Sequence, residues 1–325
     1  MRAIVVSELG NPDVLQLSEV NAPKPGPGEL LVEVGAAGVN FIETYQRSGL
    51  YQMKLPYTPG AEAAGHVLAV GAGVTDFQPG DRVATSDGWG SYAEQMIVAA
   101  DRAVPVPDGV DVETAAAAML QGMTAHYLTQ STYPVKAGET ALVHAAAGGM
   151  GLLLVQLVKA AGAKVIGTVS SEAKAKLATE AGADEIIRYD QFEGDELAAE
   201  VLRRNGGQGV HVVYDGVGAS TFEASLGSLR PRGMLVSFGN ASGPVPPVAP
   251  LRLSQGGSLF LTRPTLTNYI AARQELEWRA GDVFRWIQDG TVSIRVGAKY
   301  PLGEASQAHR DLEARKTTGK LLLIP

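Results

Sequence analysis

From about residue 140 onward, short apolar runs alternate with longer segments whose apolar residues recur every three or four positions. The short runs, bounded by glycines and other turn residues, are typical of buried strands, and the longer spacing is typical of helices. The pattern predicts six strands at residues 140–146, 163–169, 184–189, 210–215, 233–238 and 257–262. It predicts helices between the first five of them at residues 150–161, 172–181, 196–205 and 220–229. Together they predict a doubly wound parallel sheet, in which a loop over 240–255 joins the last two strands.

The chain before about residue 122 has a different pattern, with short β-like runs between glycine and proline clusters. This pattern predicts a compact, barrel-like β domain. Within it, residues 40–51 have a helical pattern, and the expected helix ends at Gly49. A further helix is expected over 112–127 and leads into the strand–helix region.

After Pro264 the strict alternation stops. The elements expected there are a helix, a strand, a helix and a last strand, over residues 268–288, 293–298, 304–315 and 320–324. These pieces are too few for a third domain, so we expect them to complete the first one. The predicted domains are therefore residues 1–124 plus 266–325, and an inserted sheet domain over 125–265.

Composition narrows the class of protein. The chain has 325 residues with 45% hydrophobic and 19% charged positions, which fits an ordinary globular protein of two domains. A net charge of −7 gives no general electrostatic reason to bind nucleic acid. The absence of cysteine excludes disulfides and cysteine-bound metals. No signal peptide or membrane span is visible, so we expect a cytoplasmic protein.

A glycine-rich turn follows the first strand of the sheet domain, with glycines at Gly148, Gly149 and Gly151. A strand, a tight glycine turn and an apolar helix form the unit that binds the pyrophosphate of a dinucleotide. The glycines permit close approach of the backbone, and the start of the helix attracts negative charge. Since glycines also serve as plain turns, the prediction depends on the strands on both sides.

The end of the second strand distinguishes NADP from NAD. A protein that binds NAD usually has Asp or Glu there, for the ribose 2′-hydroxyl. This chain has Ser170 and Ser171, followed by Lys174, and these groups suit a 2′-phosphate. Glu172 lies close by and opposes this interpretation, and Ser171 or Ser170 also fits a simple helix cap. We expect NADPH.

Motifs along nearly the whole chain resemble those of one known family. They include Gly138-Glu139, Ala146-Ala147-Gly148-Gly149-x-Gly151, Asn40-Phe-Ile-Glu-Thr-Tyr45, Val213-Tyr-Asp215, Val236-Ser-Phe-Gly-Asn240 and Leu321-Leu-Leu-Ile-Pro325. The chain resembles the zinc-free NADPH:quinone oxidoreductases, the zeta-crystallin-like branch of the medium-chain dehydrogenases/reductases. The resemblance implies a GroES-like β-barrel interrupted by a Rossmann domain.

Zinc-dependent relatives carry a Gly-His-Glu segment and catalytic cysteines. Here the segment is Gly60-Ala61-Glu62, and Asn40 stands where a cysteine ligand is expected. A catalytic zinc acts as a Lewis acid on an alcohol or carbonyl oxygen. Its ligands are missing, which argues against alcohol dehydrogenation and predicts no bound metal.

The resemblance also implies a set of cofactor contacts. Near the nicotinamide half we expect Phe41, Tyr45, Thr124 and Tyr127. At the pyrophosphate we expect Gly148, Gly149, Met150 and Gly151, where methionine replaces the commoner valine. Around the 2′-phosphate and ribose we expect Ser170, Ser171, Lys174 and Tyr189. The cleft at the strand ends should be lined by Gly216, Phe238, Gly239, Asn240, Ala241, Leu261, Thr262 and Arg263, with Arg315 from the C-terminal segment. Gly216 replaces a serine often found there.

The candidates for chemistry are Asn40, Tyr45 and Tyr51. Asn40 suits a donor to a quinone oxygen or to the carboxamide, and Tyr45 suits a hydrogen bond to the developing hydroquinone oxygen. Tyr51 suits a binding or gating role. The aromatic residues also fit simple packing, and His66 and His144, without metal-spaced partners, are interpreted as structural.

The expected function is NADPH-dependent hydride transfer to a small quinone in the cleft between the domains. One alternative is reduction of an activated C=C bond, as in enone or enoyl-thioester reductases of the same superfamily. Another is a non-catalytic protein that binds NADPH or RNA, which the acidic charge disfavours. The sixth strand at the sheet edge, and the resemblance, predict a homodimer.

Overall fold

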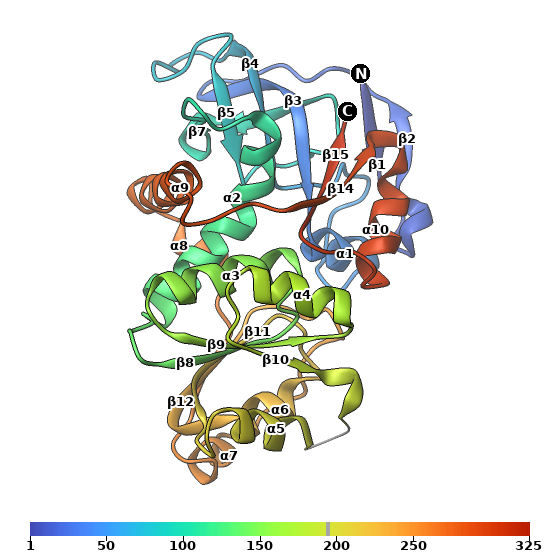
Figure 1. The fold of residues 1–325 in the computed structure, drawn as a ribbon. Coiled ribbons are helices and arrows are strands. Elements are labelled where there is room, and N and C mark those ends of the chain that lie inside the picture. The colour runs from blue at the N-terminus through green and yellow to red at the C-terminus, as the bar shows by residue number, and fades with distance from the viewer. Residues whose placement is uncertain (193–195) are drawn as a thin grey trace. The chain divides into compact units, whose positions relative to one another are not determined.

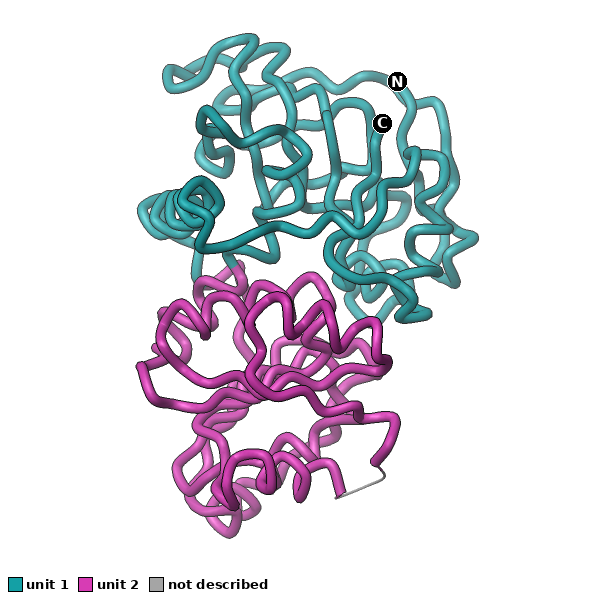
Figure 2. The backbone as a smooth tube through the Cα atoms, viewed as in Figure 1, with its two compact units in different colours: residues 1–123, 269–325 teal, residues 124–268 magenta. Residues whose placement is uncertain are grey.

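The computed structural model describes residues 1–192 and 196–325, and its contacts divide the chain into two compact units (Figure 2). Unit 1 comprises Met1–Met123 and Tyr269–Pro325, and unit 2 comprises Thr124–Asn268. The sequence pattern predicts the corresponding boundaries after residues 124 and 265. The second segment of unit 1 therefore follows the whole of unit 2 in the chain, as expected for an inserted domain.

Unit 1 is built on a seven-stranded sheet (Figure 1). Its strands are β3 (Glu29–Val39), β4 (Ala63–Val70), β5 (Arg82–Thr85), β6 (Gln95–Ala99), β7 (Val104–Pro105), β14 (Val296–Pro301) and β15 (Lys320–Ile324). The long strand β3 organises this sheet, since it pairs antiparallel with β4, β6 and β15. Every second side chain of β3, at Leu30, Val32 and Val34, lies in the hydrophobic core. Successive side chains of a strand point to opposite faces of the sheet, so this alternation is typical of a half-buried strand. A separate two-stranded ribbon joins β1 (Arg2–Val5) to β2 (Gln16–Glu19).

The helices of unit 1 include the one that bears Tyr45, with the other predicted catalytic residues, Asn40 and Tyr51, before and after it. They are α1 (Phe41–Ser48), the first part of α2 (Val112–Tyr127), α9 (Arg273–Gln288) and α10 (Ala305–Glu313). Helix α1 ends at Gly49, whose φ of 85° is a left-handed conformation that glycine adopts without strain. Short helical turns occur at Pro12–Val14, Ala100–Arg102 and Leu302–Glu304.

Unit 2 holds a six-stranded sheet in which every pair is parallel. Its strands are β8 (Thr140–Val143), β9 (Lys164–Val169), β10 (Glu185–Arg188), β11 (Val210–Asp215), β12 (Leu229–Ser237) and β13 (Phe260–Thr262). Its helices are α3 (Gly149–Ala160), α4 (Glu172–Glu180), α5 (Glu196–Arg204), α6 (Phe222–Gly227) and α7 (Pro250–Gln255), with α8 (Leu266–Tyr269) at the boundary and helical turns at Leu128–Thr132 and Tyr189–Gln191. The order β10-β9-β8-β11-β12-β13 is that of a Rossmann fold. The predicted fold class is confirmed.

Several boundaries differ from the sequence prediction, and three differences concern the segments after residue 239. The single helix expected over 268–288 is two helices, α8 and α9, with a break at 270–272. The loop expected over 240–255 contains the short helix α7. Strand β14 begins at Val296, later than residue 293.

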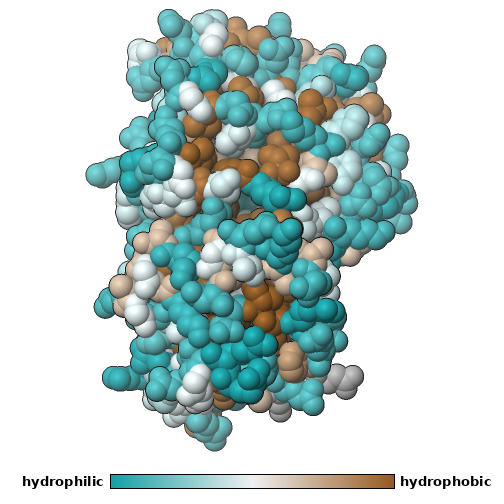
Figure 3. Space-filling view, viewed as in Figure 1, coloured by the Kyte–Doolittle hydropathy of each residue, from teal (hydrophilic) through white to brown (hydrophobic). Residues whose placement is uncertain are grey.

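The face of the molecule drawn in Figure 3 is largely polar. Hydrophilic residues cover most of the visible face, and hydrophobic residues form smaller patches between them (Figure 3). Among the described helices, none is long and apolar enough to cross a membrane.

Candidate functional site

The turn between β8 and α3 fits a dinucleotide pyrophosphate. Strand β8 ends at Val143 and not at Ala146, because Ala145 adopts a left-handed φ of 51° and the chain turns there. Gly148 caps α3 and donates its N–H to the Ala145 carbonyl at 2.9 Å. A Cβ atom on Gly151 would overlap the backbone of Ala145 and Ala146, so this position requires glycine. The first N–H groups of a helix lack partners within it, and they attract phosphate together with the helix dipole.

The predicted cofactor residues of unit 2 that follow its strands lie at the carboxyl edge of the parallel sheet. They are Gly148–Gly151 after β8, Ser170 and Ser171 after β9, Tyr189 after β10, Gly216 after β11, Phe238–Ala241 after β12, and Leu261–Arg263 at the end of β13. The strand order reverses between β8 and β11, and open α/β sheets bind ligands at such a switch point.

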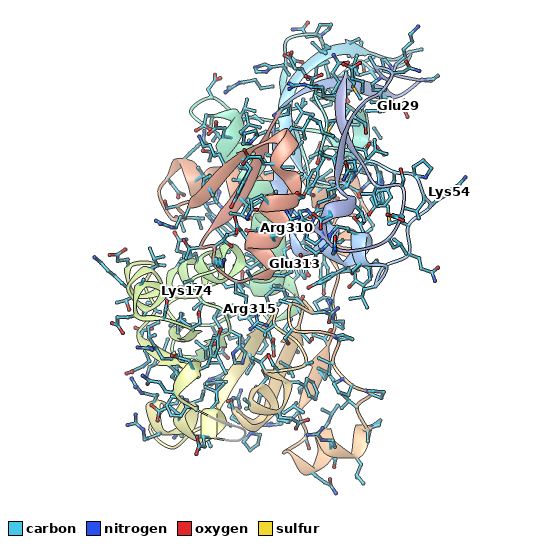
Figure 4. The ribbon with its side chains drawn as sticks, turned by 90° about the vertical axis from the view of Figure 1, so that its right-hand side faces the viewer. Glu29, Lys54, Lys174, Arg310, Glu313 and Arg315 are labelled. Atoms are coloured by element: carbon cyan, nitrogen blue, oxygen red, sulfur yellow. The ribbon has the colours of Figure 1, made fainter. Side chains whose placement is uncertain are left out.

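At the end of β9, a lysine and a serine point their polar groups at one another. Lys174 Nζ, on α4, donates to Ser170 Oγ at 3.1 Å (Figure 4 labels Lys174). Ser171 caps α4 by accepting from the Lys174 N–H at 3.4 Å, so its capping role is also present. The Glu172 side chain is 87% exposed and lies 3.9 Å from the Arg188 guanidinium. Arg188 itself binds Asp190 at 2.7 Å, and the Lys174 ammonium, not the Glu172 carboxylate, lies next to Ser170.

The ends of β11 and β12 pack closely against each other. Phe238 donates its N–H to the Asp215 carbonyl at 2.8 Å, and a Cβ atom on Gly216 would meet the Phe238 ring at 2.8 Å. A serine at position 216 would therefore press on this ring. Gly239 has the same constraint, since its Cβ would overlap the Gly216 carbonyl.

Asp215 anchors this edge through a buried polar network. Its carboxylate accepts from the N–H groups of Val217 and Gly218, and from the hydroxyls of Thr221 and Ser225 at 2.8 and 2.7 Å. The Ser225 hydroxyl donates to Asp215, so His144 Nε2, at 3.0 Å, is the donor to Ser225. Burial lowers the pKa of His144. A neutral His144 thus ties the start of the glycine turn to the Asp215 network.

Thr124, Tyr127 and Arg315 are predicted cofactor residues that lie away from the strand ends of unit 2. Thr124 and Tyr127 are in the last turn of α2 and are buried, with Tyr127 only 2% exposed. Arg315 belongs to unit 1 and follows the end of α10, where Figure 4 labels it beside Arg310 and Glu313. It is exposed and has a left-handed φ of 56°.

In unit 1, helix α1 gathers the aromatic candidates. The Phe41 and Tyr45 rings are stacked with centroids 6.2 Å apart, because residues four apart share one helix face. The Tyr51 ring meets the Tyr45 ring edge-on at 5.4 Å. Tyr51 is 38% exposed, whereas Asn40, the cap of α1, is 4% exposed.

Asn40 belongs to a buried charged cluster that the sequence analysis did not identify. Its Nδ2 donates to Glu62 Oε2 at 2.9 Å, and its Oδ1 accepts from Lys320 Nζ at 2.5 Å. Its backbone N–H donates to Glu43 Oε2 at 2.8 Å. Burial raises the pKa of Glu43 to about 7, although the positive charge of Lys320 opposes this shift. The one signal in the sequence is a lysine directly before the apolar run Leu321–Ile324.

The residues here do not fit a catalytic zinc. Ala61 offers no ligand, the chain has no cysteine, and Lys320 already donates to the Glu62 carboxylate. Within residues 1–192 and 196–325, no group of three or more His, Cys, Asp or Glu is placed to hold a metal ion.

Comparison with known proteins identifies the family of this chain. A family model described as an alcohol dehydrogenase GroES-like domain matches residues 26–108, and one described as a zinc-binding dehydrogenase matches residues 149–286. A quinone oxidoreductase of Pseudomonas aeruginosa is 47% identical over 326 residues, covering 100% of this chain and 99% of that protein. The structure of Escherichia coli quinone oxidoreductase complexed with NADPH matches with a TM-score of 0.97 at 44% identity, over 100% of both chains. A 2-haloacrylate reductase of a Burkholderia species is 40% identical over 331 residues, covering 99% of this chain and 98% of that protein.

Proposed function

This chain belongs to the quinone oxidoreductase family of the medium-chain dehydrogenases/reductases, and from that premise we propose that it reduces small quinones with NADPH, without zinc. The observation that carries the cofactor assignment is the sheet edge of unit 2. There the glycine turn at Gly148–Gly151 follows β8, and Ser170, bonded to Lys174 of α4, follows the neighbouring strand β9. When bound, NADPH supplies a hydride to the quinone, which takes up one further proton from solvent to give the hydroquinone.

We propose that unit 2 holds the cofactor and that unit 1 contributes the substrate groups. The N–H groups of Gly149 and Met150 would bind the pyrophosphate, and Ser170, Lys174 and Tyr189 the 2′-phosphate and ribose. The remaining cofactor contacts would come from Phe41, Tyr45, Thr124, Tyr127, Gly148, Gly151, Ser171, Gly216, Phe238, Gly239, Asn240, Ala241, Leu261, Thr262, Arg263 and Arg315. Most of these assignments are supported by positions at strand ends or in α1, and those of Thr124, Tyr127, Lys174 and Arg315 by the resemblance to the family.

In unit 1, Asn40 and Tyr45 would act on the quinone oxygen. Asn40 would donate an amide N–H, and Tyr45 a hydroxyl, as negative charge develops on that oxygen. Tyr51, partly exposed and edge-on to Tyr45, would bind or gate the substrate. Positioning and hydrogen bonding are then the main catalytic contributions of the protein.

The test is NADPH oxidation by the purified protein with a panel of benzoquinones and naphthoquinones, with NADH in parallel. We expect turnover with several quinones and a clear preference for NADPH. A protein that binds NADPH but oxidises it with none of these acceptors would contradict the proposal.

A second candidate is reduction of an activated C=C bond. It is favoured by the 40% identity to the 2-haloacrylate reductase, which extends over nearly the whole chain. The same hydride donor and a similar hydrogen-bond donor would serve an α,β-unsaturated acid or enone. Turnover on 2-haloacrylate or an enone far above that on quinones would select this function.

We also propose a homodimer formed through β13. This strand is the edge of the six-stranded sheet, and its Phe260 is 55% exposed, so it offers both unpaired backbone and an apolar side chain. Light scattering should give a dimeric mass, and Phe260→Asp should lower it to that of a monomer. A wild-type protein of monomeric mass would remove this proposal. The predicted cytoplasmic location is tested separately, by fractionation of cells.

A further inference from the structure

A lysine ammonium lies buried next to Asn40 in unit 1. The Lys320 side chain is 2% exposed, and its Nζ donates to Asn40 Oδ1 and to Glu62 Oε2, each at 2.5 Å. The second oxygen of Glu62, which is fully buried, accepts from the Leu120 N–H of α2 at 2.7 Å. Gly38 of β3 leaves the space for this pair, since a Cβ atom there would overlap the Glu62 carboxylate.

These contacts determine how the Asn40 amide is oriented. An ammonium only donates and a carboxylate only accepts, so Oδ1 must face Lys320 and Nδ2 must face Glu62. Gln121 Nε2 donates to the same Oδ1 at 3.3 Å. A side-chain amide has two donor hydrogens and two acceptor positions. Among the described residues, these bonds occupy both acceptor positions and one hydrogen, which leaves one Nδ2 hydrogen for a ligand oxygen.

We propose that Lys320 and Glu62 are positioning residues that act through Asn40. They hold its amide so that it presents an N–H, and never its carbonyl oxygen, to the acceptor oxygen of the substrate. This inference rests on the proposed function, in which Asn40 donates to that oxygen. Hydrogen bonds to charged groups are the stronger ones, so the ammonium and carboxylate clamp the amide more firmly than neutral groups would.

The ammonium has a second effect on the donor. Because Lys320 Nζ draws electron density toward Oδ1, it polarises the amide and makes the remaining Nδ2 hydrogen more positive. A preorganised donor aimed at developing negative charge lowers the barrier of the step in which that charge forms. The pair therefore affects turnover more than it affects cofactor binding.

The test variant is the double substitution Lys320→Met with Glu62→Gln. Removing both charges avoids leaving one of them buried without a partner, and such neutral replacements are usually tolerated by the fold. The matched control is Lys299→Met with Glu113→Gln. It removes a pair of the same residue types from unit 1, where Lys299 on β14 meets Glu113 on α2 with side chains 50% and 40% exposed.

We expect quinone turnover by the test variant to fall about ten- to a hundred-fold, the range for a reacting group that is misplaced by about an ångström. The dissociation constant of NADPH should change less than about two-fold, and the control should match wild type in both measurements. Asn40→Ala should lose turnover to a similar extent. Combined with the test variant, it should cause no further loss, because the pair acts through the amide that is already gone.

Turnover of the test variant within about two-fold of wild type would overturn the inference, and so would losses that multiply when Asn40→Ala is added. A wild-type protein that reduces no acceptor would instead reject the proposed function, and the inference with it. Lys320→Gln with Glu62→Gln, which keeps hydrogen-bonding groups at both positions, is the second variant if the first does not fold. We expect it to lose less turnover. If it too fails to fold, the pair is needed for the fold and the positioning role is rejected.

Discussion

Replacement of Glu43 by glutamine should change how the stability of unit 1 depends on pH. Glu43 is fully buried, its Oε2 accepts the Asn40 N–H, and its Oε1 has no partner among the described atoms. Burial raises its pKa from 4.5 to about 7. Between these values the folded protein holds a proton that the unfolded chain has released, so the contribution of Glu43 to stability falls as the pH rises from 4.5 to about 7.

The magnitude follows from the difference of about 2.5 units between 4.5 and 7. At about 1.4 kcal/mol per unit, the full penalty is roughly 3 kcal/mol and is present above the folded pKa. Glutamine cannot ionise, and its amide oxygen still accepts from the Asn40 N–H as the third residue of the capping box. Relative to wild type, Glu43→Gln should therefore gain roughly 2 to 3 kcal/mol of unfolding free energy between about pH 5 and about pH 8.

The assay is urea unfolding followed by tryptophan fluorescence. All three tryptophans, Trp89, Trp278 and Trp286, lie in unit 1, so the signal reports on the unit that holds Glu43. Glu8→Gln, at an exposed position of the same unit, is the control and should follow the wild-type pH dependence. Stability curves of wild type and Glu43→Gln that stay parallel from about pH 5 to about pH 8 would show that burial does not keep this carboxyl protonated.

Three further predictions concern the proposed cofactor and substrate groups. Lys174→Ala should lower the preference for NADPH over NADH about ten- to a hundred-fold, since a charge-assisted bond to the 2′-phosphate is lost. Lys176→Ala, on the same helix but 79% exposed and facing Glu180, should leave the preference unchanged. Gly151→Ala should weaken NADPH binding and lower the stability of the protein, because the added Cβ atom would overlap the backbone of the glycine turn. The control is Gly281→Ala in α9, where the added Cβ atom meets open space and should raise stability by about 0.5–1 kcal/mol. Tyr45→Phe keeps the ring contact with Tyr51 but removes the hydroxyl. It should reduce quinone turnover about ten-fold without changing the affinity for NADPH. Unchanged turnover would show that Tyr45 serves only to pack against its neighbours.

Local sequence patterns predict the sheet domain well, because each of its strand–helix–strand segments is contiguous in sequence. The strands of a parallel sheet are buried on both faces and are mostly apolar, and the helices between them have their own periodicity. The boundaries of α2 agree with the prediction for the same reason. The glycine turn was also predictable, since Gly151 fits where any side chain would overlap the preceding backbone.

Interactions between distant residues explain what the sequence did not predict. The helix expected over 268–288 is broken because Arg102 donates to the carbonyls of Ile270 and Ala271, and Arg279 to that of Tyr269. These bonds satisfy carbonyls that a continuous helix would use itself. Likewise, no local pattern indicates that Lys320 contacts Asn40, 280 positions away in sequence.

The buried carboxylate of Glu62 is neutralised by a cation of the chain itself. A buried carboxylate needs a compensating cation. Here the compensating cation is a side chain of the protein: the Lys320 ammonium lies 2.5 Å from Glu62 Oε2. A divalent ion on the same carboxylate would meet this positive charge at hydrogen-bond distance and would be repelled. The groups proposed to stabilise negative charge on a substrate oxygen are the Tyr45 hydroxyl and the Asn40 N–H with the ammonium behind it, and the Lys320 and Glu62 variants test the second of these.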